Sequence, residues 1–330
     1  MIRVGLVGLG GISKVHLDAY AVLDNLKLVA AADVRGEASP RYDLARELGA
    51  TVYTSIDDML ANEELDMLDV CTPTPLHGAM VKEAMKRGMH VLSEKPMCRT
   101  AAECEEMVAL SKENGGLYMV AHVVRFMKPY AYLRSVIRSG ELGKLVHLSM
   151  KRLSHMPDWS HEDWLITPEK SGGAPLDLSI HDIDFVYSIL GEPREVTGIY
   201  RTALDESGHI MNDVIISDLV YDGTAVNITG AFYNADIPFT AEYFAMFEGG
   251  RVELVGGKVY KCGEEVDLEA EEAGKGDTGI NISGSGAYTE EIAYFASCIE
   301  AGKQPELVTP ESSLGSVRLV ERIVKAAKKA

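Results

Sequence analysis

Paired cysteines, long apolar runs and an excess of basic residues are all missing from this sequence of 330 residues. Its five cysteines are scattered, odd in number and without metal-ligand spacing, so we expect free thiols in a reducing cytoplasm and no metal site. No apolar stretch approaches the length of a membrane span. The formal net charge of −18 repels a phosphate backbone, which argues against nucleic-acid binding.

We expect neither a leader nor a flexible linker. Met1 runs straight into an apolar segment without a basic region, so we expect no secretory signal, no membrane partner and a cytoplasmic protein. The length suits two domains rather than one core, and the composition, 46% hydrophobic and 25% charged, is typical of a globular protein. Because no stretch rich in Gly, Ser or Pro separates the halves, we expect closely docked domains.

The first 120 residues alternate short apolar strands with helices. Strands are predicted at 3–7, 27–32, 51–53, 67–71, 90–93 and 118–121, and helices at 11–23, 40–48, 55–60, 76–87 and 101–114. This order is typical of a doubly wound parallel sheet with right-handed crossovers. We therefore predict a dinucleotide-binding Rossmann domain over residues 1–122.

The rhythm changes after residue 122. Helices are predicted at 130–139, 179–190, 288–301 and 310–329, and residues 195–268 are strand-like with Gly and Asp-Gly turns. The acidic stretch 264–272 is expected to be a solvated hairpin rim. This pattern favours an α+β domain over residues 123–330, with a large, mainly antiparallel open sheet.

A glycine-rich turn follows the first strand and opens the first helix. The run from Gly8 through Gly10, Gly11 and Ile12 to Ser13 fits G-x-G-x-x-G with serine at the last position. The first glycine allows a tight turn, and the second lets the backbone approach a pyrophosphate on the helix N-terminus. A tight turn without a ligand is the alternative for such a motif by itself.

A carboxylate ends the second strand. Asp33 lies 23 residues beyond Gly10, where it can accept hydrogen bonds from the ribose diol of the adenosine. It favours NAD, because it would repel the 2′-phosphate of NADP. Arg35 stands two residues further on and could offset that repulsion, so NADP is the alternative cofactor; otherwise Arg35 is a surface arginine.

A lysine follows another buried strand directly. Lys95 ends the run His90-Val91-Leu92-Ser93-Glu94-Lys95-Pro96, at the carboxyl end of a strand, where α/β sheets bind their ligands. By itself it would be a surface lysine beside a turn proline. Next to a dinucleotide site, its ammonium is suited to hold an oxygen on which negative charge develops.

Acidic residues surround a histidine in the second half of the chain. Asp177 and His181 are spaced i, i+4, which puts them on one face of a helix, and Asp184 is three residues further on. A histidine held by a carboxylate is suited to act as a general base near neutral pH. The alternative is a helix-capping Asp177 and an interface histidine. With Lys95 and a nicotinamide, this set would supply what oxidation of an alcohol needs.

Taken together, these segments resemble the glucose–fructose oxidoreductase / inositol dehydrogenase (Gfo/Idh/MocA) family nearly from end to end. The resemblance rests on the glycine turn with His16, on the segments 71–77 and 88–96, on Arg125-Phe126 with Pro129, and on 140–143, 171–173 and 177–184. It implies Lys95 near both nicotinamide and substrate, Glu94 beside it, and a Lys95–Pro96 bond that is cis in some members.

The resemblance also implies further roles. Asp177 and His181 match the catalytic pair of the family, Thr72, Pro73 and His77 match a segment that lines the cofactor, and Arg125 matches a position near substrate. The C-terminal sheet of the family often forms homodimers or homotetramers, so we expect one of these.

Substrate contacts are also sought in the second domain. His155, Trp164 and Tyr233 combine polar groups with aromatic surface, which suits a sugar or polyol, although each could equally be a core or interface residue. We therefore predict an NAD(P)-dependent oxidoreductase acting on a secondary alcohol of a sugar, cyclitol or related polyol. The alternatives are an NAD-dependent glycosidase of the same family and a non-catalytic, cofactor-sensing regulatory protein.

Overall fold

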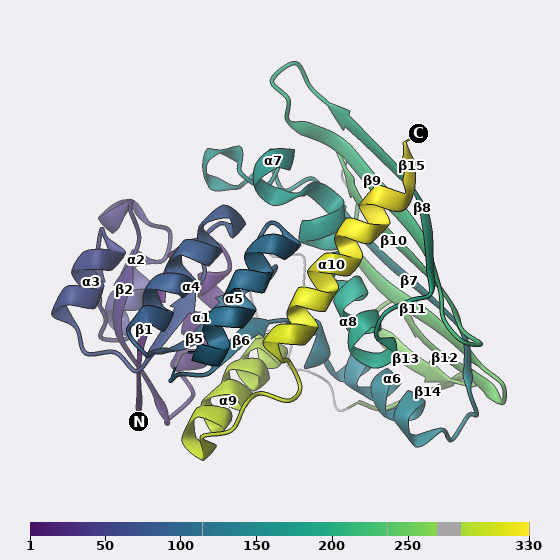
Figure 1. The fold of residues 1–330 in the computed structure, drawn as a ribbon, viewed down its shortest axis with the longest axis horizontal. Helices are drawn as coiled ribbons and strands as arrows, with labels where there is room; N and C mark the ends of the chain where they lie inside the picture. Colours follow the sequence, from purple (N-terminus) through teal and green to yellow (C-terminus); the bar gives the residue numbers. More distant parts are fainter. Residues whose placement is uncertain (114, 236, 269–284, 330) are drawn as a thin grey trace. The chain divides into compact units, whose positions relative to one another are not determined.

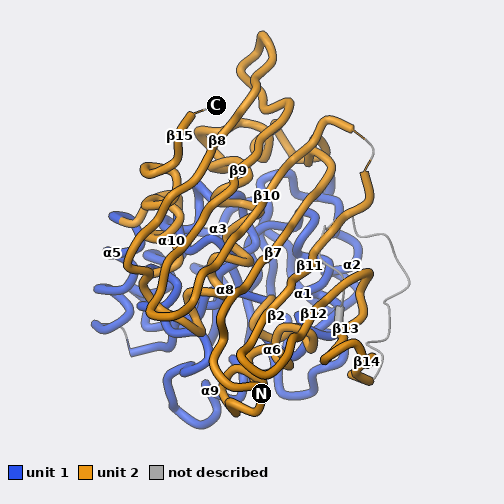
Figure 2. Tube along the Cα trace, turned by 90° about the vertical axis from the view of Figure 1, so that its right-hand side faces the viewer, with its two compact units in different colours: residues 1–98, 102–123, 272–314 blue, residues 99–101, 124–271, 315–330 orange. Residues whose placement is uncertain are grey.

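The chain divides into two compact units (Figure 2). The structure, a computed structural model, describes residues 1–330 except 114, 236, 269–284 and 330. Of these, unit 1 holds residues 1–98, 102–123 and 285–314, and unit 2 holds residues 99–101, 124–268 and 315–329.

Unit 1 is built on a sheet of six parallel strands in the order β3-β2-β1-β4-β5-β6 (Figure 1). This order is that of a dinucleotide-binding doubly wound sheet, and it confirms the fold predicted for the first part of the chain. Its near-continuous apolar burial is typical of parallel strands that are covered on both faces. The strands are β1 (Ile2–Val7), β2 (Leu26–Ala32), β3 (Thr51–Tyr53), β4 (Met67–Val70), β5 (His90–Glu94) and β6 (Tyr118–Ala121).

One helix of unit 1 comes from late in the chain. α9 packs against α1, and the rings of His16 and Tyr288 lie 6.2 Å apart. The compact units thus change at residues 123 and 124, close to the predicted boundary, and again beyond the large sheet, where the sequence showed no second change. The helices of this part are α1 (Ser13–Tyr20), α2 (Tyr42–Glu47), α3 (Ile56–Asn62), α4 (His77–Lys86), α5 (Ala101–Glu113) and α9 (Ser285–Ala301).

Unit 2 is built on a nine-stranded sheet in the order β14-β13-β12-β11-β7-β10-β9-β8-β15. Its neighbouring strands are antiparallel except for the pairs β10–β7 and β15–β8, so the predicted large, mainly antiparallel sheet is confirmed. The strands are β7 (Leu145–His155), β8 (Glu195–Leu204), β9 (Ile210–Val220), β10 (Ala225–Tyr233), β11 (Thr240–Phe247), β12 (Gly250–Val255), β13 (Lys258–Lys261), β14 (Glu264–Glu265) and β15 (Ala327–Lys329).

Helices cover one face of this sheet (Figure 1). They are α6 (Lys128–Ser139), the short α7 (Pro168–Ser171), α8 (Ile180–Leu190) and most of α10 (Pro310–Ala326). On the face turned to the viewer in Figure 2, no helix of the described part of unit 2 covers the strands. Burial accordingly alternates along β9, where Ile215 and Leu219 are buried and Ile216 and Val220 are exposed.

Two smaller expectations concern the surface. The acidic stretch contributes the exposed strand β14 to a hairpin with β13, and its part from residue 269 onward lies outside the described residues. No described helix is both long enough and apolar enough to cross a membrane.

Candidate active site

The glycine turn has the geometry of a pyrophosphate cradle. Gly8 has φ +95°, and a Cβ there would lie 2.6 Å from the carbonyl oxygen of Cys71, so a side chain is excluded. A Cβ on Gly10 would meet nothing within 4 Å, which leaves open space above the turn. Ser13 donates through Oγ to the Gly10 carbonyl at 2.8 Å and begins α1. Serine thus closes the turn at the position of the third glycine.

Asp33 is tied to the same turn. Its Oδ2 accepts a hydrogen bond from the Leu9 amide at 2.8 Å and another from Arg35 Nη2 at 2.8 Å, and its Oδ1 accepts from Arg35 Nε at 2.9 Å. Burial raises the pKa of Asp33, but the hydrogen bonds from Arg35 and the Leu9 amide outweigh it and hold this pKa at about 2. Arg35 is therefore the partner of Asp33 rather than an isolated surface arginine.

The segment after β4 lies beside the turn. Thr72 and Pro73 are half-buried, and His77 is buried at the start of α4. One ring nitrogen of His77 lies 2.9 Å from the Pro96 carbonyl oxygen, and the other lies 2.8 Å from that of Thr72. The ring thus has backbone partners that the sequence did not reveal, and the cofactor contacts of these three residues stay predictions.

Lys95 follows the last residue of β5. It is half-buried, its backbone N–H donates to Glu94 Oε2 at 3.0 Å, and its bond to Pro96 is cis. Strand β5 lies next to β4 in the sheet, and β4 lies next to β1, which ends at the glycine turn. The carboxyl ends of these parallel strands share one edge, so Lys95 stands at the edge where this fold binds its dinucleotide.

A buried polar network beneath this edge was missed by the sequence analysis. His16 on α1 lies with Nδ1 2.8 Å from Asp69 Oδ2 and with Nε2 3.1 Å from Glu94 Oε1, and Tyr20 donates to Asp69 at 2.6 Å. The ring is fully buried. Burial lowers the pKa of His16, but the negative charge and hydrogen bond of Asp69 outweigh this and raise the pKa well above its ordinary value.

Two features of this network concern metals and thiols. His16, Asp69 and Cys71 could offer metal ligands, since their ligand-type atoms lie within 4.8 Å of one another, but the hydrogen bonds already account for that geometry. Burial raises the pKa of Cys71 to about 12, which makes its thiol inert at neutral pH. The sequence did contain one sign of this buried network, because Asp69 is a carboxylate inside the otherwise apolar strand β4.

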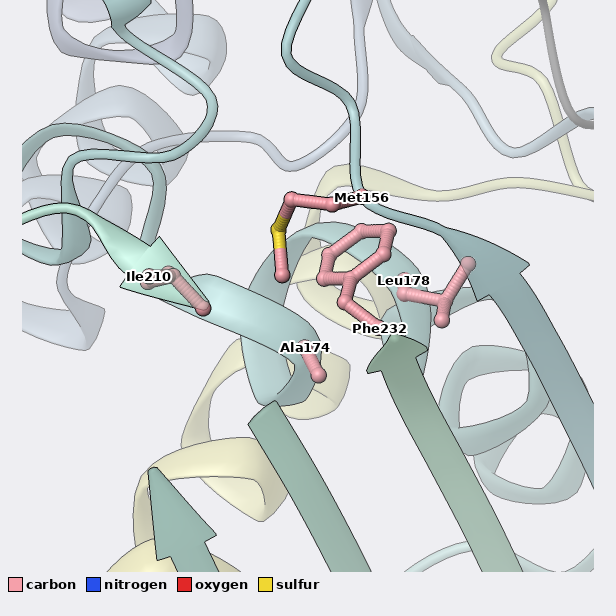
Figure 3. Packing of buried hydrophobic residues seen from close by; sticks show 5 residues of the cluster. All are labelled: Met156, Ala174, Leu178, Ile210 and Phe232. Carbon is pink, nitrogen blue, oxygen red and sulfur yellow. The ribbon is translucent and has the colours of Figure 1, made fainter. Parts of the chain in front are cut away.

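In unit 2, a two-glycine turn leads into the predicted catalytic segment. Gly173 has φ 62° and ψ −161°, and the Ala174 amide that follows donates to Asp213 Oδ2 at 2.6 Å. Asp213 lies on β9 and is fully buried, which raises its pKa. The turn opens a single π-helical turn, η5 (Ala174–Leu178), whose Ala174 and Leu178 pack with the apolar side chains Met156, Ile210 and Phe232 (Figure 3).

Asp177 and His181 lie on consecutive elements. Asp177 is half-buried on η5, and His181 is 3% exposed on the first turn of α8. The Ser179 amide donates to the Ala174 carbonyl at 2.7 Å, five residues back, so the predicted single helix is a π-turn joined to an α-helix. The spacing argument that put Asp177 and His181 on one helix face assumed a single regular helix, so it does not apply in that form.

Both carboxylates that follow His181 are held by buried arginines. Arg152 on β7 contacts Asp182 at 2.7 and 3.1 Å, and Arg125 contacts Asp184 at 2.6 and 2.8 Å. Ser316 on α10 also donates to Asp184 at 2.7 Å. The spacing of Asp184 from His181 did not reveal these partners. Arg125 is 2% exposed, and its contact with a substrate stays a prediction.

Two of the other predicted substrate residues meet at the end of β7. His155 and Tyr233 are register neighbours on the parallel strands β7 and β10, and His155 Nδ1 lies 2.8 Å from the Ala235 carbonyl oxygen. Trp164 is half-buried in the loop that precedes α7. Their contacts with a substrate stay predictions.

This chain combines a parallel sheet that carries a pyrophosphate turn with a large mixed sheet. These features place it in the class of two-domain, dinucleotide-binding proteins. Two family models match: "Oxidoreductase family, NAD-binding Rossmann fold" at residues 2–122 and "GFO/IDH/MocA C-terminal domain" at residues 130–258. The chain belongs to this Gfo/Idh/MocA family. Membership confirms the predicted family, the oxidoreductase class and NAD as the cofactor.

Relatives of known name and structure agree with this assignment. The chain is 32% identical over 209 residues to the 2,7-anhydro-N-acetylneuraminate hydratase of Escherichia coli, covering 63% of this chain and 55% of that one. It is 28% identical to D-xylose 1-dehydrogenase (NADP(+)) 2 of Haloferax volcanii, covering 98% and 96%. Myo-inositol 2-dehydrogenase of Lactobacillus plantarum shares the fold, with TM-score 0.80, 23% identity and coverage of 99% and 97%. The chain spans about half the length of some curated relatives that it matches.

Proposed function

We propose that this protein transfers a hydride between NAD and a secondary alcohol of a sugar, cyclitol or related polyol. The observation that carries the proposal is the place of Lys95, one residue beyond Glu94 at the carboxyl edge of an NAD-binding sheet. An amine there can reach a ligand that lies against the nicotinamide.

The proposed chemistry divides the work between three side chains. When bound, NAD supplies the hydride acceptor. Lys95 holds the substrate oxygen as negative charge develops on it. His181 takes the hydroxyl proton, and Asp177 orients His181 or a substrate hydroxyl. The buried ion pairs of Asp182 and Asp184 support this assignment, because they fix the helix turn that carries His181.

The substrate class is supported by relatives of two kinds. Related chains are named as a D-xylose 1-dehydrogenase and an inositol 2-dehydrogenase, and both names indicate polyhydroxylated substrates. Half-buried His155, Trp164 and Tyr233 offer the aromatic and hydrogen-bonding surface that such substrates use.

A second candidate is a reaction without net oxidation, in which the cofactor is reduced and reoxidised within one turnover. The similarity to a protein named as a hydratase favours this candidate. It predicts product formation without a lasting change in absorbance at 340 nm.

A homodimer or homotetramer through the large sheet is part of the proposal. The face of this sheet that lacks helices exposes Ile199, Ile216, Phe244 and Met246 on three strands, at 48%, 36%, 37% and 40%. Exposed apolar side chains on a sheet face without helices are typical of a protein interface.

The test is a screen of sugars and cyclitols with NAD and NADP, followed by variants on the best substrate. We expect Lys95→Ala and His181→Ala each to lower kcat/KM by about 100-fold or more. Lys86→Ala and His209→Ala, on exposed or partly exposed sites, are the matched controls. Normal turnover by both Lys95→Ala and His181→Ala would overturn the proposal.

A further inference from the structure

The chain around Lys95 lies beyond the last backbone pairing between β4 and β5. That pairing ends at Val70 and Ser93, and the next residue, Glu94, pairs with Ala121 of β6. Lys95 therefore follows a strand that has already separated from β4. Side chains, rather than the sheet ladder, must tie this segment to the β4 side of the nucleotide-binding edge.

His16 provides such a tie on the N-terminal side of Lys95. Its ring lies between Asp69 of β4 and Glu94 of β5, and Glu94 in turn accepts the backbone N–H of Lys95 through its other carboxylate oxygen. All three side chains are at least nine-tenths buried. An unpaired carboxylate at that depth is costly, so the contact with the His16 ring holds Glu94 in one orientation.

His77 provides a tie on the C-terminal side. Its two ring nitrogens lie 2.8 Å from the carbonyl oxygen of Thr72, just after β4, and 2.9 Å from that of Pro96, just after Lys95. Burial lowers the pKa of His77, although hydrogen bonds to the two carbonyl oxygens favour the protonated ring. The neutral ring donates its single N–H to one of these oxygens and packs against the other. With the ring 1% exposed, the segments after β4 and β5 are held at a fixed separation.

We propose that His16 and His77 are positioning residues for Lys95, because each links the residue on one side of it to the β4 side of the sheet. The inference rests on the proposed role of Lys95 in hydride transfer. It assigns neither histidine a contact with substrate. It also accounts for a carboxylate, Asp69, inside an apolar strand and for a histidine on the helix that follows the glycine turn.

The alternative is that both histidines only stabilise unit 1. His90 offers a matched control, because it lies at the opposite end of β5 from Lys95. Its Nδ1 accepts a hydrogen bond from the Leu117 amide at 2.9 Å. Replacing it removes a long-range histidine hydrogen bond from the same strand without touching either neighbour of Lys95.

The experiment compares the full-length variants His16→Gln, His77→Gln, His90→Gln and Lys95→Ala. Amide hydrogen exchange of the peptide 93–98 reports the position of the segment without any substrate. NADH fluorescence titration reports cofactor affinity, and steady-state kinetics on the best substrate report kcat and KM. If His16→Gln does not fold, Asp69→Asn and Glu94→Gln weaken the His16 link with smaller changes in volume.

We expect faster exchange at 93–98 in the His16 and His77 variants and not in His90→Gln. Their kcat should fall about 10-fold to 100-fold while NADH affinity changes by less than about threefold, as for a displaced catalytic group. Wild-type exchange at 93–98 in both variants would overturn the inference.

Faster exchange with kcat equal to that of His90→Gln, while Lys95→Ala is inactive, would overturn it as well. If Lys95→Ala is fully active, the proposed function fails, and the exchange data alone then decide whether the two histidines hold the segment.

Discussion

At the scale of single residues, the partners of a buried charge decide what that charge can do. Asp33 was expected to face a ribose, and the structure shows that Arg35 and the Leu9 amide already occupy its oxygens. A ribose diol must therefore share or displace the Arg35 contacts. The pKa of His16, in turn, is raised because the carboxylate of Asp69 lies against its buried ring.

Removing the Asp33 carboxylate should shift the cofactor preference toward NADP. The Asp33→Ala variant loses the group that repels a 2′-phosphate and releases the Arg35 guanidinium, which suits phosphate recognition. We expect the ratio of NADPH to NADH affinity to rise by about 10-fold or more, measured by fluorescence titration. Asp24→Ala, an exposed acidic residue of unit 1, is the control. An unchanged ratio would mean that Asp33 serves the glycine turn alone.

The His16 ring should carry two protons well above neutral pH. Its pKa is raised by Asp69, so the stability it contributes is complete below about pH 6.5 and is lost as pH rises through the raised pKa of the folded state. Nitrogen-15 NMR of histidine-labelled protein should show both ring nitrogens protonated at pH 8, with the signal assigned through His16→Gln. The titratable groups around the ring are Asp69, Glu94, Cys71, Tyr288 of α9 and, through its hydrogen bond to Asp69, Tyr20. A neutral ring at pH 7 would contradict this expectation.

At the scale of elements, the segment from Gly172 to Leu190 shows how local backbone and distant partners combine. Two glycines with positive φ reverse the chain, Asp213 of β9 anchors the next amide, and Ser179 fits against β10 where Gly230 has no side chain. Arginines from two other elements then fix α8. A π-helical turn results because these anchors outweigh regular helical hydrogen bonding.

A methyl group on Gly173 should be strongly destabilising. A Cβ there would lie 2.2 Å from Asp213 Oδ2, and φ 62° with ψ −161° is a region open to glycine. We expect Gly173→Ala to lower the free energy of unfolding by about 3 kcal/mol in urea titrations. Gly208→Ala, which has positive φ but open space around its Cβ, should cost about 1 kcal/mol. Equal costs would show that the clash with Asp213 is relieved by a small shift.

Breaking the pair between Arg152 and Asp182 should cost more than removing it entirely. Arg152→Met leaves a carboxylate that is 1% exposed without its cation, which costs about 3–5 kcal/mol. The double variant Arg152→Met/Asp182→Leu removes both charges and should recover much of that loss. Urea unfolding of the two variants and wild type measures the difference. A double variant as unstable as the single one would show that packing, rather than charge, governs this site.

At the scale of the whole molecule, the order of the chain and the composition of its compact units differ. Residues 285–314 belong to unit 1 although they follow the large sheet of unit 2 in the sequence. The large sheet meanwhile keeps one face free of helices among the described residues of its unit. Residues 285–314 thus tie the C-terminal region to unit 1. The sheet face without helices leaves apolar side chains exposed.

A charge on that surface should break the proposed assembly. Ile216 is 36% exposed on β9 and is a register neighbour of exposed Ile199 on β8. We expect wild type to be a dimer or tetramer by size-exclusion chromatography with light scattering, and Ile216→Lys to yield smaller species. Val22→Lys, at a 65% exposed position of unit 1, is the control. A monomeric wild type at micromolar concentration would contradict the proposal.

The sequence predicted whole elements well where a pattern was local. The six parallel strands and the large, mainly antiparallel sheet were predicted from periodicity and turn residues, and the glycine turn from its spacing. The return of α9 to unit 1 could not be predicted, because an amphipathic helix does not specify which apolar surface it covers. The site residues were chosen one by one, and their partners came from strands and helices far away in the chain.

What the sequence by itself determined is most of the elements, the NAD-binding turn and the family, because each rests on patterns that are local, within one short segment or a series of them. Tertiary structure alone decided which charges are paired. Asp69 with His16, Asp182 with Arg152 and Asp184 with Arg125 join residues 53, 30 and 59 positions apart. Such pairs form only when folding removes water from both partners, so no local pattern of residues records them.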